Sequence, residues 1–208
     1  MTILRDCRTS LEFGVTVGSL ITSYIQFPAE MAQSPTRSDP LPIQQLQTVA
    51  DLLDTPARAC LYAYILQHGP VTVSEIIDAL DIPQGTAYDY VETLETAGLV
   101  KKLRDQRPYE YDAEAIALTL STDGETQTIT PALIAAVACR DEDEDIEVYI
   151  QRHGVDGLAV ALEYASEYVE GTVNHRIAAR ELDLSPLEAE IILQALEPVA
   201  MEFAETAV

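Results

Sequence analysis

The sequence predicts a mainly α-helical fold with small β-hairpins, and three observations support this class. Most of the chain after residue 42 shows apolar residues at helical spacing. Several of these segments open with a capping motif or with proline in the first turn, which are typical helix starts. Two shorter segments, residues 99–112 and 116–130, instead have the pattern of strands on either side of a turn. With 208 residues, 48% of them hydrophobic, the chain can bury a core in one or two domains.

The charge balance is strongly acidic. The chain holds 35 Asp and Glu against 12 Lys and Arg, a formal net charge of −23, and the acidic residues are spread along it rather than collected in a tail. This composition, with only two lysines, resembles that of haloarchaeal proteins, which work in molar salt. At such ionic strength the Debye length is about 3 Å, so only close charge contacts with a partner count.

Residues 1–42 are expected to be an N-terminal extension or linker, either disordered or the product of a misassigned start site. Met31 opens a polar stretch rich in Pro and Ser, of the kind that precedes a first helix. The apolar residues 13–27 are too short to span a membrane, and they follow a mixed-charge start unlike that of a signal peptide. These features favour a cytoplasmic protein with no membrane segment.

The first two helices are predicted over residues 43–54 and 56–68. Asp54-Thr55-Pro56 separates them and puts proline in the first turn of the second helix. Gly69 is expected to end that helix in the left-handed conformation, because Pro70 cannot continue it.

Two further helices are predicted around a tight turn. Thr72 and Glu75 form a capping box for a short helix over residues 73–80. The following DIPQ segment breaks this helix, so a new one begins near Gln84. Its buried stripe is expected at Ala87, Val91 and Leu94.

A hairpin is predicted after Gly98, which caps the last of these helices. Residues 99–104 have the pattern of a strand, and residues 108–112 that of its return strand, with Tyr109 and Tyr111 on one face. Helix, helix, tight turn, helix and hairpin is the order of a winged helix-turn-helix. We therefore expect a winged helix-turn-helix domain over residues 43–113.

Residues Val71–Lys102, VTVSEIIDALDIPQGTAYDYVETLETAGLVKK, resemble the winged helix-turn-helix of archaeal transcription regulators of the TrmB-like and ArsR-like kinds. In those proteins a helix ending in LE-x-AGL leads directly into the wing. The resemblance covers about a third of the chain, roughly residues 56–112. It implies a protein that binds double-stranded DNA and regulates transcription.

The resemblance places the helix that begins near Gln84 in the major groove, with its outward residues near base edges. The candidate DNA-binding residues of this helix are Gln84, Gly85, Thr86, Tyr88 and Asp89. Gln84 can pair with adenine, Thr86 can touch a thymine methyl or a phosphate, and Tyr88 can donate to phosphate. Gly85 lets the backbone approach phosphate, and Asp89 either accepts from cytosine or faces a neighbouring side chain. The alternative is that these residues are polar because the face is solvated.

The predicted wing contains four of the basic residues, Lys101, Lys102, Arg104 and Arg107. The functional interpretation is that they contact backbone phosphates, with Arg104 or Arg107 reaching the minor groove. The alternative is an edge strand whose lysines prevent aggregation.

Residues 114–208 are predicted to form a hairpin followed by a helical domain for dimerisation or sensing. The hairpin turns at Asp123-Gly124. Helices are predicted over residues 131–138, 145–151, 155–169 and 185–203, and the last opens with a capping box of Ser185 and Glu188.

A second helix-turn-helix is one interpretation of residues 172–197. The segment RELDLSPLEAEIILQAL (180–196) aligns without gaps with DALDIPQGTAYDYVETL (78–94), and His175, Arg176 and Arg180 form a basic cluster beside it. The other interpretation is two ordinary amphipathic helices around a capped turn.

The sequence shows no motif for catalysis, for a cofactor or for a metal ion. We therefore expect a regulator that binds DNA as a homodimer, since one recognition helix reads few base pairs. The alternative function is a winged-helix adaptor that contacts another protein and does not bind DNA. A small-molecule effector, the operator and the direction of regulation are not evident from the sequence.

Overall fold

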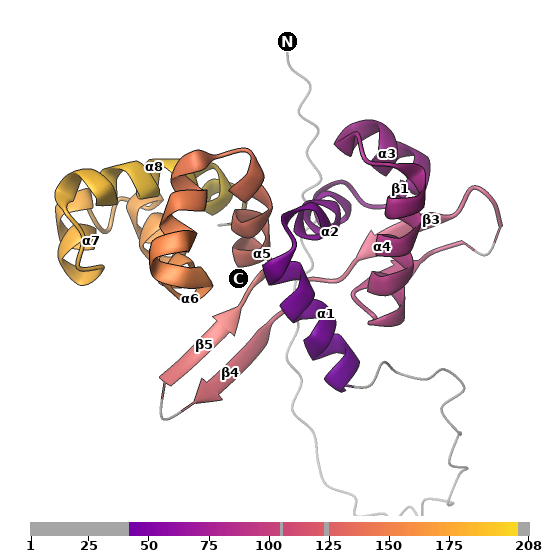
Figure 1. Ribbon diagram of the computed structural model, residues 1–208, viewed down its shortest axis with the longest axis horizontal. Helices are drawn as coiled ribbons and strands as arrows, with labels where there is room; N and C mark the ends of the chain where they lie inside the picture. The colour runs from indigo at the N-terminus through magenta and orange to yellow at the C-terminus, as the bar shows by residue number, and fades with distance from the viewer. Residues whose placement is uncertain (1–41, 105, 123–124, 204–208) are drawn as a thin grey trace, which may run out of the picture. The chain divides into compact units, whose positions relative to one another are not determined.

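The computed structural model describes residues 42–104, 106–122 and 125–203, which all lie within one compact unit (Figure 1). The predicted fold class is confirmed, since helices dominate and the strands form small antiparallel sheets. The predicted N-terminal extension lies outside the described residues except for Pro42. No helix in the described part of the chain is long and apolar enough to cross a membrane.

Helices α1 (Pro42–Asp54) and α2 (Pro56–His68) open the described chain, with Pro56 in the first turn of α2 as predicted. The expectation for Gly69 is wrong. Its φ of −57° is not left-handed, and its amide donates to the Ile65 carbonyl at 2.8 Å. Glycine is needed here for space, because a Cβ would lie 2.5 Å from Asp112 Oδ1 and 2.7 Å from the Ile65 carbonyl oxygen.

The helix-turn-helix consists of α3 (Val73–Leu80) and α4 (Gln84–Thr96). The Thr72 hydroxyl accepts from the Glu75 amide, and the Glu75 carboxylate accepts from the Thr72 amide at 2.7 Å, so the predicted capping box forms. Asp81 makes the turn in the left-handed conformation, with φ of 50°. The buried stripe of α4 is the predicted one: Ala87, Val91 and Leu94.

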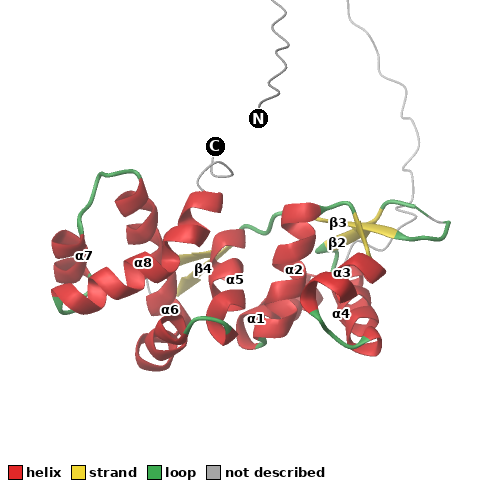
Figure 2. Ribbon diagram, turned by 90° about the horizontal axis from the view of Figure 1, so that it is seen from above, coloured by secondary structure: helices red, strands yellow, loops and turns green. Residues whose placement is uncertain are grey.

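The wing is a three-stranded antiparallel sheet in the order β1-β3-β2 (Figure 2). Strand β1 (Val71–Thr72) precedes α3, and β2 (Val100–Lys102) and β3 (Glu110–Ala113) follow α4. Lys102 pairs with Tyr111 in the register of β2 and β3. The strands are shorter than expected from residues 99–104 and 108–112, because the chain leaves the ladder on both sides of the turn.

The second half begins with a hairpin of β4 (Leu118–Thr122) and β5 (Glu125–Ile129), which is followed by α5 (Pro131–Ala138) and a short 3₁₀ turn (Cys139–Asp141). Helix α6 (Glu144–Val169) contains Gly154 with φ of 73° and ψ of 178°. This non-helical residue divides α6 into two parts that correspond to the two helices predicted on either side of it.

Helices α7 (His175–Glu181) and α8 (Pro186–Phe203) end the described chain, and their backbone repeats that of α3 and α4. Asp183 adopts φ of 54° between them, as Asp81 does between α3 and α4. In both pairs the N-cap residue lies the same number of positions before this aspartate, and the next helix begins the same number of positions after it. Asn174 and Pro186 therefore occupy the places that Thr72 and Gln84 have in the first pair.

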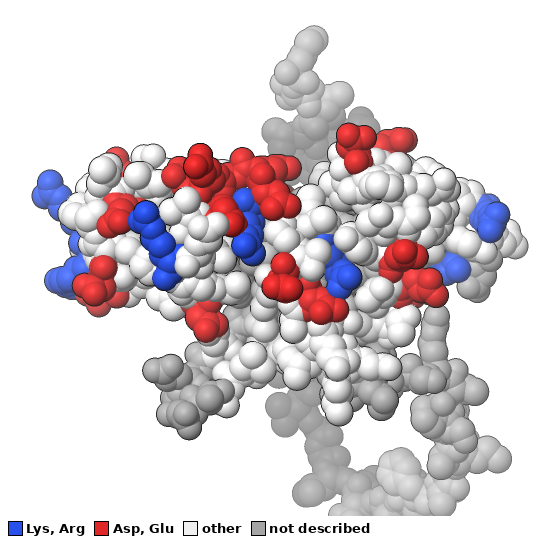
Figure 3. Space-filling view, in the orientation of Figure 1, with Lys and Arg blue, Asp and Glu red and all other residues white. Residues whose placement is uncertain are grey.

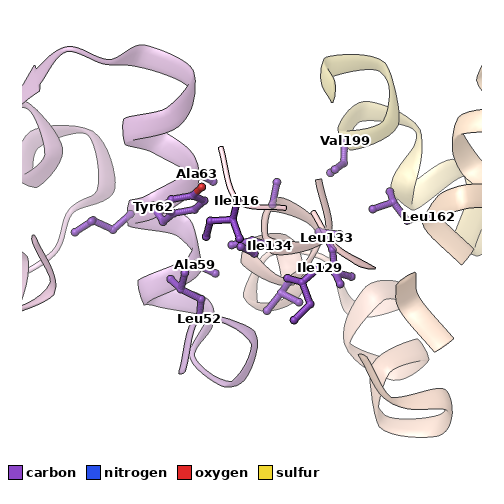
Figure 4. Packing of buried hydrophobic residues seen from close by; sticks show 14 of the residues in the cluster. Leu52, Ala59, Tyr62, Ala63, Ile116, Ile129, Leu133, Ile134, Leu162 and Val199 are labelled. Carbon is purple, nitrogen blue, oxygen red and sulfur yellow. The ribbon is translucent and has the colours of Figure 1, made fainter. Parts of the chain in front are cut away.

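One continuous core joins the two halves of the described chain. Helix α2 packs against α5, and Figure 4 shows Tyr62 of α2 beside Ile116 and Ile134 of the later segment. Further along the same cluster lie Leu133, Leu162 and Val199 (Figure 4). The winged helix-turn-helix and the following helices therefore share a hydrophobic core, and the boundary at residue 113 stays a prediction.

Candidate nucleic-acid interface

The first turn of α4 presents an uncharged surface. Gln84 and Gly85 are exposed, Thr86 is half-buried, and Tyr88 is exposed on the next turn. A Cβ at Gly85 would meet no atom of the described residues within 4 Å, so packing among them does not explain this glycine. The exposed main chain here is open to a close approach by a phosphate or a base.

Farther along, α4 becomes acidic. Asp89 and Glu92 are both exposed, and with Asp51 of α1 they line a shallow groove of about 480 Å³ between the two helices. The Asp89 carbonyl accepts a 2.7 Å hydrogen bond from the Thr93 hydroxyl. Helix α4 contains no Lys or Arg, so any positive charge for binding DNA must come from other elements.

The wing supplies this charge, but two of its four cations are held by carboxylates. Lys101 forms an ion pair with Glu114, which follows β3. Arg104 lies 2.9 Å from Glu110 in β3. These carboxylates neutralise half of the charge that the sequence predicted for DNA.

Lys102 and Arg107 lie instead on one aromatic ring. The Lys102 ammonium is 3.6 Å from the centroid of the Tyr109 ring, and the Arg107 guanidinium carbon is 5.8 Å from it. Within the described residues neither cation forms an ion pair with a carboxylate. We call Lys102, Arg107 and Tyr109 the wing cluster. Basic side chains stand out at the right of Figure 3, where Figure 1 places the β2–β3 loop.

The ion pairs of Lys101 and Arg104 are too weak to prevent these side chains from binding phosphate. The Lys101 and Arg104 side chains are 59% and 63% exposed. Exposed ion pairs contribute about 0–1 kcal/mol each, so a phosphate can replace the carboxylate at small cost. The Lys101 and Arg104 side chains are therefore accessible to phosphate despite their ion pairs.

The partners Tyr109, Glu110 and Glu114 were missed as functional residues from the sequence. Strand register is the signal that could have found Glu114: Lys101 faces Asp112, and the residue two positions on lies on the same face. The pairing of residues between β2 and β3 can be derived only when the ends of both strands are known, and the sequence did not define them.

The surface of α8 differs from that of α4 despite the repeated backbone. The positions equivalent to Gln84, Gly85, Thr86, Tyr88 and Asp89 hold Pro186, Leu187, Glu188, Glu190 and Ile191. None of these side chains is a hydrogen-bond donor, and Leu187 is 66% exposed. In the adjacent basic cluster Arg180 pairs with Glu181 at 2.5 Å. The backbone of α7 and α8 is thus similar to that of α3 and α4, but α8 offers no side-chain hydrogen-bond donor at these positions.

The acidic run of residues 141–145 contributes a helix cap. Asp143 of the acidic run 141–145 caps α6, with its carboxylate accepting from the Asp145 and Ile146 amides. No group of three His, Cys, Asp or Glu side chains in the described residues could hold a metal ion. Burial raises the pKa of the Cys60 and Cys139 thiols, which disfavours reactive thiolates.

Comparisons with known proteins divide the chain in two. Residues 55–116 match the family model described as the sugar-specific transcriptional regulator TrmB, which agrees with the winged-helix geometry. Residues 140–205 match a family of unknown function, DUF7437. No curated protein and no solved structure matched the chain. Residues 55–116 thus form a winged-helix domain similar to that of the TrmB family, which is described as a family of transcriptional regulators.

Proposed function

We propose that this protein is a sequence-specific regulator of transcription that binds double-stranded DNA as a homodimer in the cytoplasm. Helix α4 enters the major groove with Gln84, Gly85, Thr86, Tyr88 and Asp89, and the wing contacts the backbone or the minor groove. This proposal rests on the TrmB match and extends it to particular residues.

The observation that most supports this proposal is the location of the Lys and Arg side chains that form no ion pair. Most Lys and Arg side chains of the described residues are paired with carboxylates, and only Lys102, Arg107 and Arg176 are not. Two of these three belong to the wing cluster, directly after the recognition helix in the chain. In molar salt long-range attraction is screened, so DNA must be held by such short contacts.

DNA binding can be tested by fluorescence anisotropy with duplexes recovered from a genomic occupancy map, in molar KCl. The variant Lys102→Ala/Arg107→Ala should lose affinity for every duplex and reduce the slope of log K against log salt by about two. The control Arg152→Ala/Arg176→Ala makes the same change of charge outside the winged helix and should bind as the wild type does. Equal affinity of the wing variant and the wild type would contradict the proposal.

The adaptor alternative draws on the acidic part of α4. Asp89 and Glu92, with Asp51, would repel phosphate and attract a basic protein surface. An occupancy map without enriched DNA sites, together with no measurable duplex binding, would favour this function.

The homodimer is proposed to form through the outer face of α1. Ile43 is 70% exposed and Leu46 is 43% exposed, and Ala50 continues the same stripe one turn farther on. The segment from Pro42 to Ala50, PIQQLQTVA, contains no charged residue in a chain of net charge −23. A second copy can therefore dock on this face without like-charge repulsion.

The outer face of α8 fits a second copy less well. Leu187, Ile191 and Met201 are exposed there, but Glu188, Glu190 and Glu202 are exposed near them. Two such acidic faces would repel each other at close range, so α1 is the preferred contact.

A further inference from the structure

A cavity of about 430 Å³ lies where the segment after the wing meets α5, α6 and α8. Its size is in the range of sites for small molecules. Helices α5, α6 and α8 form most of its wall, together with residues 115–117 of the connecting segment. Thr128 of β5, Thr130 at the start of α5 and Glu170 at the end of α6 complete it. Ile116, Leu133 and Leu162, which line it, are seen in Figure 4.

The wall of the cavity is predominantly apolar. The apolar lining residues are mostly small or aliphatic, with one aromatic ring: Ala115, Ile116, Ala117, Pro131, Ala132, Leu133, Ala159, Leu162, Ala200 and Phe203. Among the described residues, the lining includes no Asn, Gln, His, Lys, Arg or Tyr. A sugar needs many hydrogen bonds to its hydroxyl groups, and the ten apolar residues of this wall offer no side-chain partners for them.

Five polar residues of the described chain line the cavity: Thr128 and Thr130 between β5 and α5, Glu163 and Ser166 of α6, and Glu170 at the end of α6. Two of them are charged, Glu163 and Glu170. The Ser166 hydroxyl is already engaged, since it donates to the Leu162 carbonyl at 3.1 Å. Neither glutamate side chain forms an ion pair or a hydrogen bond within the described part of the chain. An apolar wall beside two unpartnered carboxylates is suited to an apolar molecule with a positive charge.

The cavity is also close to the residue that holds Lys101. Ala115 of its wall follows Glu114, whose carboxylate pairs with Lys101 and whose amide donates to the Leu99 carbonyl at 3.0 Å. A ligand that shifts residues 115–117 would thus move a residue that contacts the wing at two points.

We propose that this cavity binds an apolar small molecule bearing a positive charge, and that such a ligand changes the affinity of the wing for DNA. The second half of this proposal rests on the proposed function, but the first half does not. Binding is therefore measured first in the absence of DNA.

The binding test uses two probes of the same shape and opposite charge, tetraphenylphosphonium and tetraphenylborate, by titration calorimetry with the full chain in molar NaCl. Tetraphenylphosphonium should bind saturably to one site per chain, and more tightly than tetraphenylborate. Glu163→Gln/Glu170→Gln should weaken the cation about three- to tenfold. The matched control Glu144→Gln/Glu190→Gln removes the same charge from exposed positions outside the lining and should leave binding unchanged.

A second variant tests the apolar wall. Ala159→Phe places a large side chain in the cavity and should abolish binding of the cation. Absence of saturable cation binding, or equal binding of both probes, would overturn the site. The site would also be overturned if Glu163→Gln/Glu170→Gln and Glu144→Gln/Glu190→Gln weakened cation binding equally, because the net charge of the chain would then be the cause.

The DNA arm uses the same protein. Saturating tetraphenylphosphonium should change duplex affinity in the wild type and not in Ala159→Phe, whose cavity no longer accepts the cation. Cation binding with unchanged duplex affinity would overturn the coupling. Cation binding by a protein that binds no duplex would instead overturn the proposed function and leave the site intact.

Discussion

The buried phenol of Tyr62 donates a 2.6 Å hydrogen bond to the main-chain carbonyl of Glu114, which connects α2 to the segment that leaves the wing. Burial raises the pKa of this phenol, so it remains a donor across the working pH range. The same Glu114 holds Lys101 by its carboxylate. Glu114 thus joins the core helix, the wing and the wall of the cavity.

Removing this phenol should destabilise the fold. Tyr62→Phe leaves the Glu114 carbonyl without its donor, which costs about 1–3 kcal/mol. Thermal unfolding should show a midpoint lower by roughly 2–4 °C per kcal/mol. Tyr111→Phe is the control, because the Tyr111 hydroxyl has no hydrogen-bond partner in the described residues, and its midpoint should stay close to that of the wild type.

Freeing a wing lysine should strengthen DNA binding. Glu114→Gln removes the carboxylate that competes with phosphate for Lys101, so duplex affinity should rise by up to about fivefold. Anisotropy titrations in molar KCl would measure this rise, with Glu144→Gln as a variant of equal charge away from the wing. A fall in affinity would mean that Lys101 does not contact phosphate.

Substitutions in the first turn of α4 should change which sequence is preferred. Gln84→Ala removes a side chain that can pair with adenine, and the loss of one such contact costs about 1–3 kcal/mol at the affected base pair. Selection from random duplexes would reveal a relaxed preference there. An unchanged selection profile for Gln84→Ala and Thr86→Ala would count against direct reading of bases by α4.

Charge on the outer face of α1 should separate the dimer. Ile43→Asp/Leu46→Asp buries two carboxylates in the proposed interface, and sedimentation velocity should then show monomers at concentrations where the wild type is dimeric. Leu187→Asp/Met201→Asp makes the same chemical change on α8 and should leave the dimer intact. If the α8 variant dissociates and the α1 variant does not, the interface has been placed on the wrong helix.

Two helix caps should make the fold sensitive to acid. Hydrogen bonds from Thr72 lower the pKa of Glu75, and hydrogen bonds from Ser185 lower that of Glu188. Because each folded-state pKa lies below its ordinary value of 4.5, the stabilisation is present above that value and is lost as the pH falls through the folded pKa. Urea unfolding at pH 7 and pH 3 should therefore show a smaller acid-induced loss for Glu75→Gln/Glu188→Gln than for the wild type. An equal loss would assign the acid sensitivity to other carboxylates.

The local parts of the fold were predictable from the sequence because their signals are local. Thr72 with Glu75 and Ser185 with Glu188 define helix starts within four residues, and the stripe Ala87, Val91 and Leu94 follows from helical spacing. The same holds for the hairpin of β4 and β5, whose turn lies outside the described residues.

Features that depend on long-range packing were not predictable. Gly69 suggested a left-handed cap, but the residue is instead restricted by the Ile65 carbonyl and by Asp112, and the contact with Asp112 is distant in sequence. Strand β1 has two residues and exists only because β3 pairs with it. The ion pairs of Lys101 and Arg104, the shared core and the cavity likewise need contacts that no short segment specifies.

The repeated turn of Asp81 and Asp183 shows that backbone geometry and surface chemistry vary separately in this chain. A search by shape alone would not separate the pair α3 and α4 from the pair α7 and α8, and only the side chains distinguish them. It also makes α8 a natural recipient for protein engineering. Grafting Gln84, Gly85, Thr86 and Tyr88 onto the equivalent positions of α8 would test whether a helix pair with this backbone geometry needs only these side chains to bind DNA.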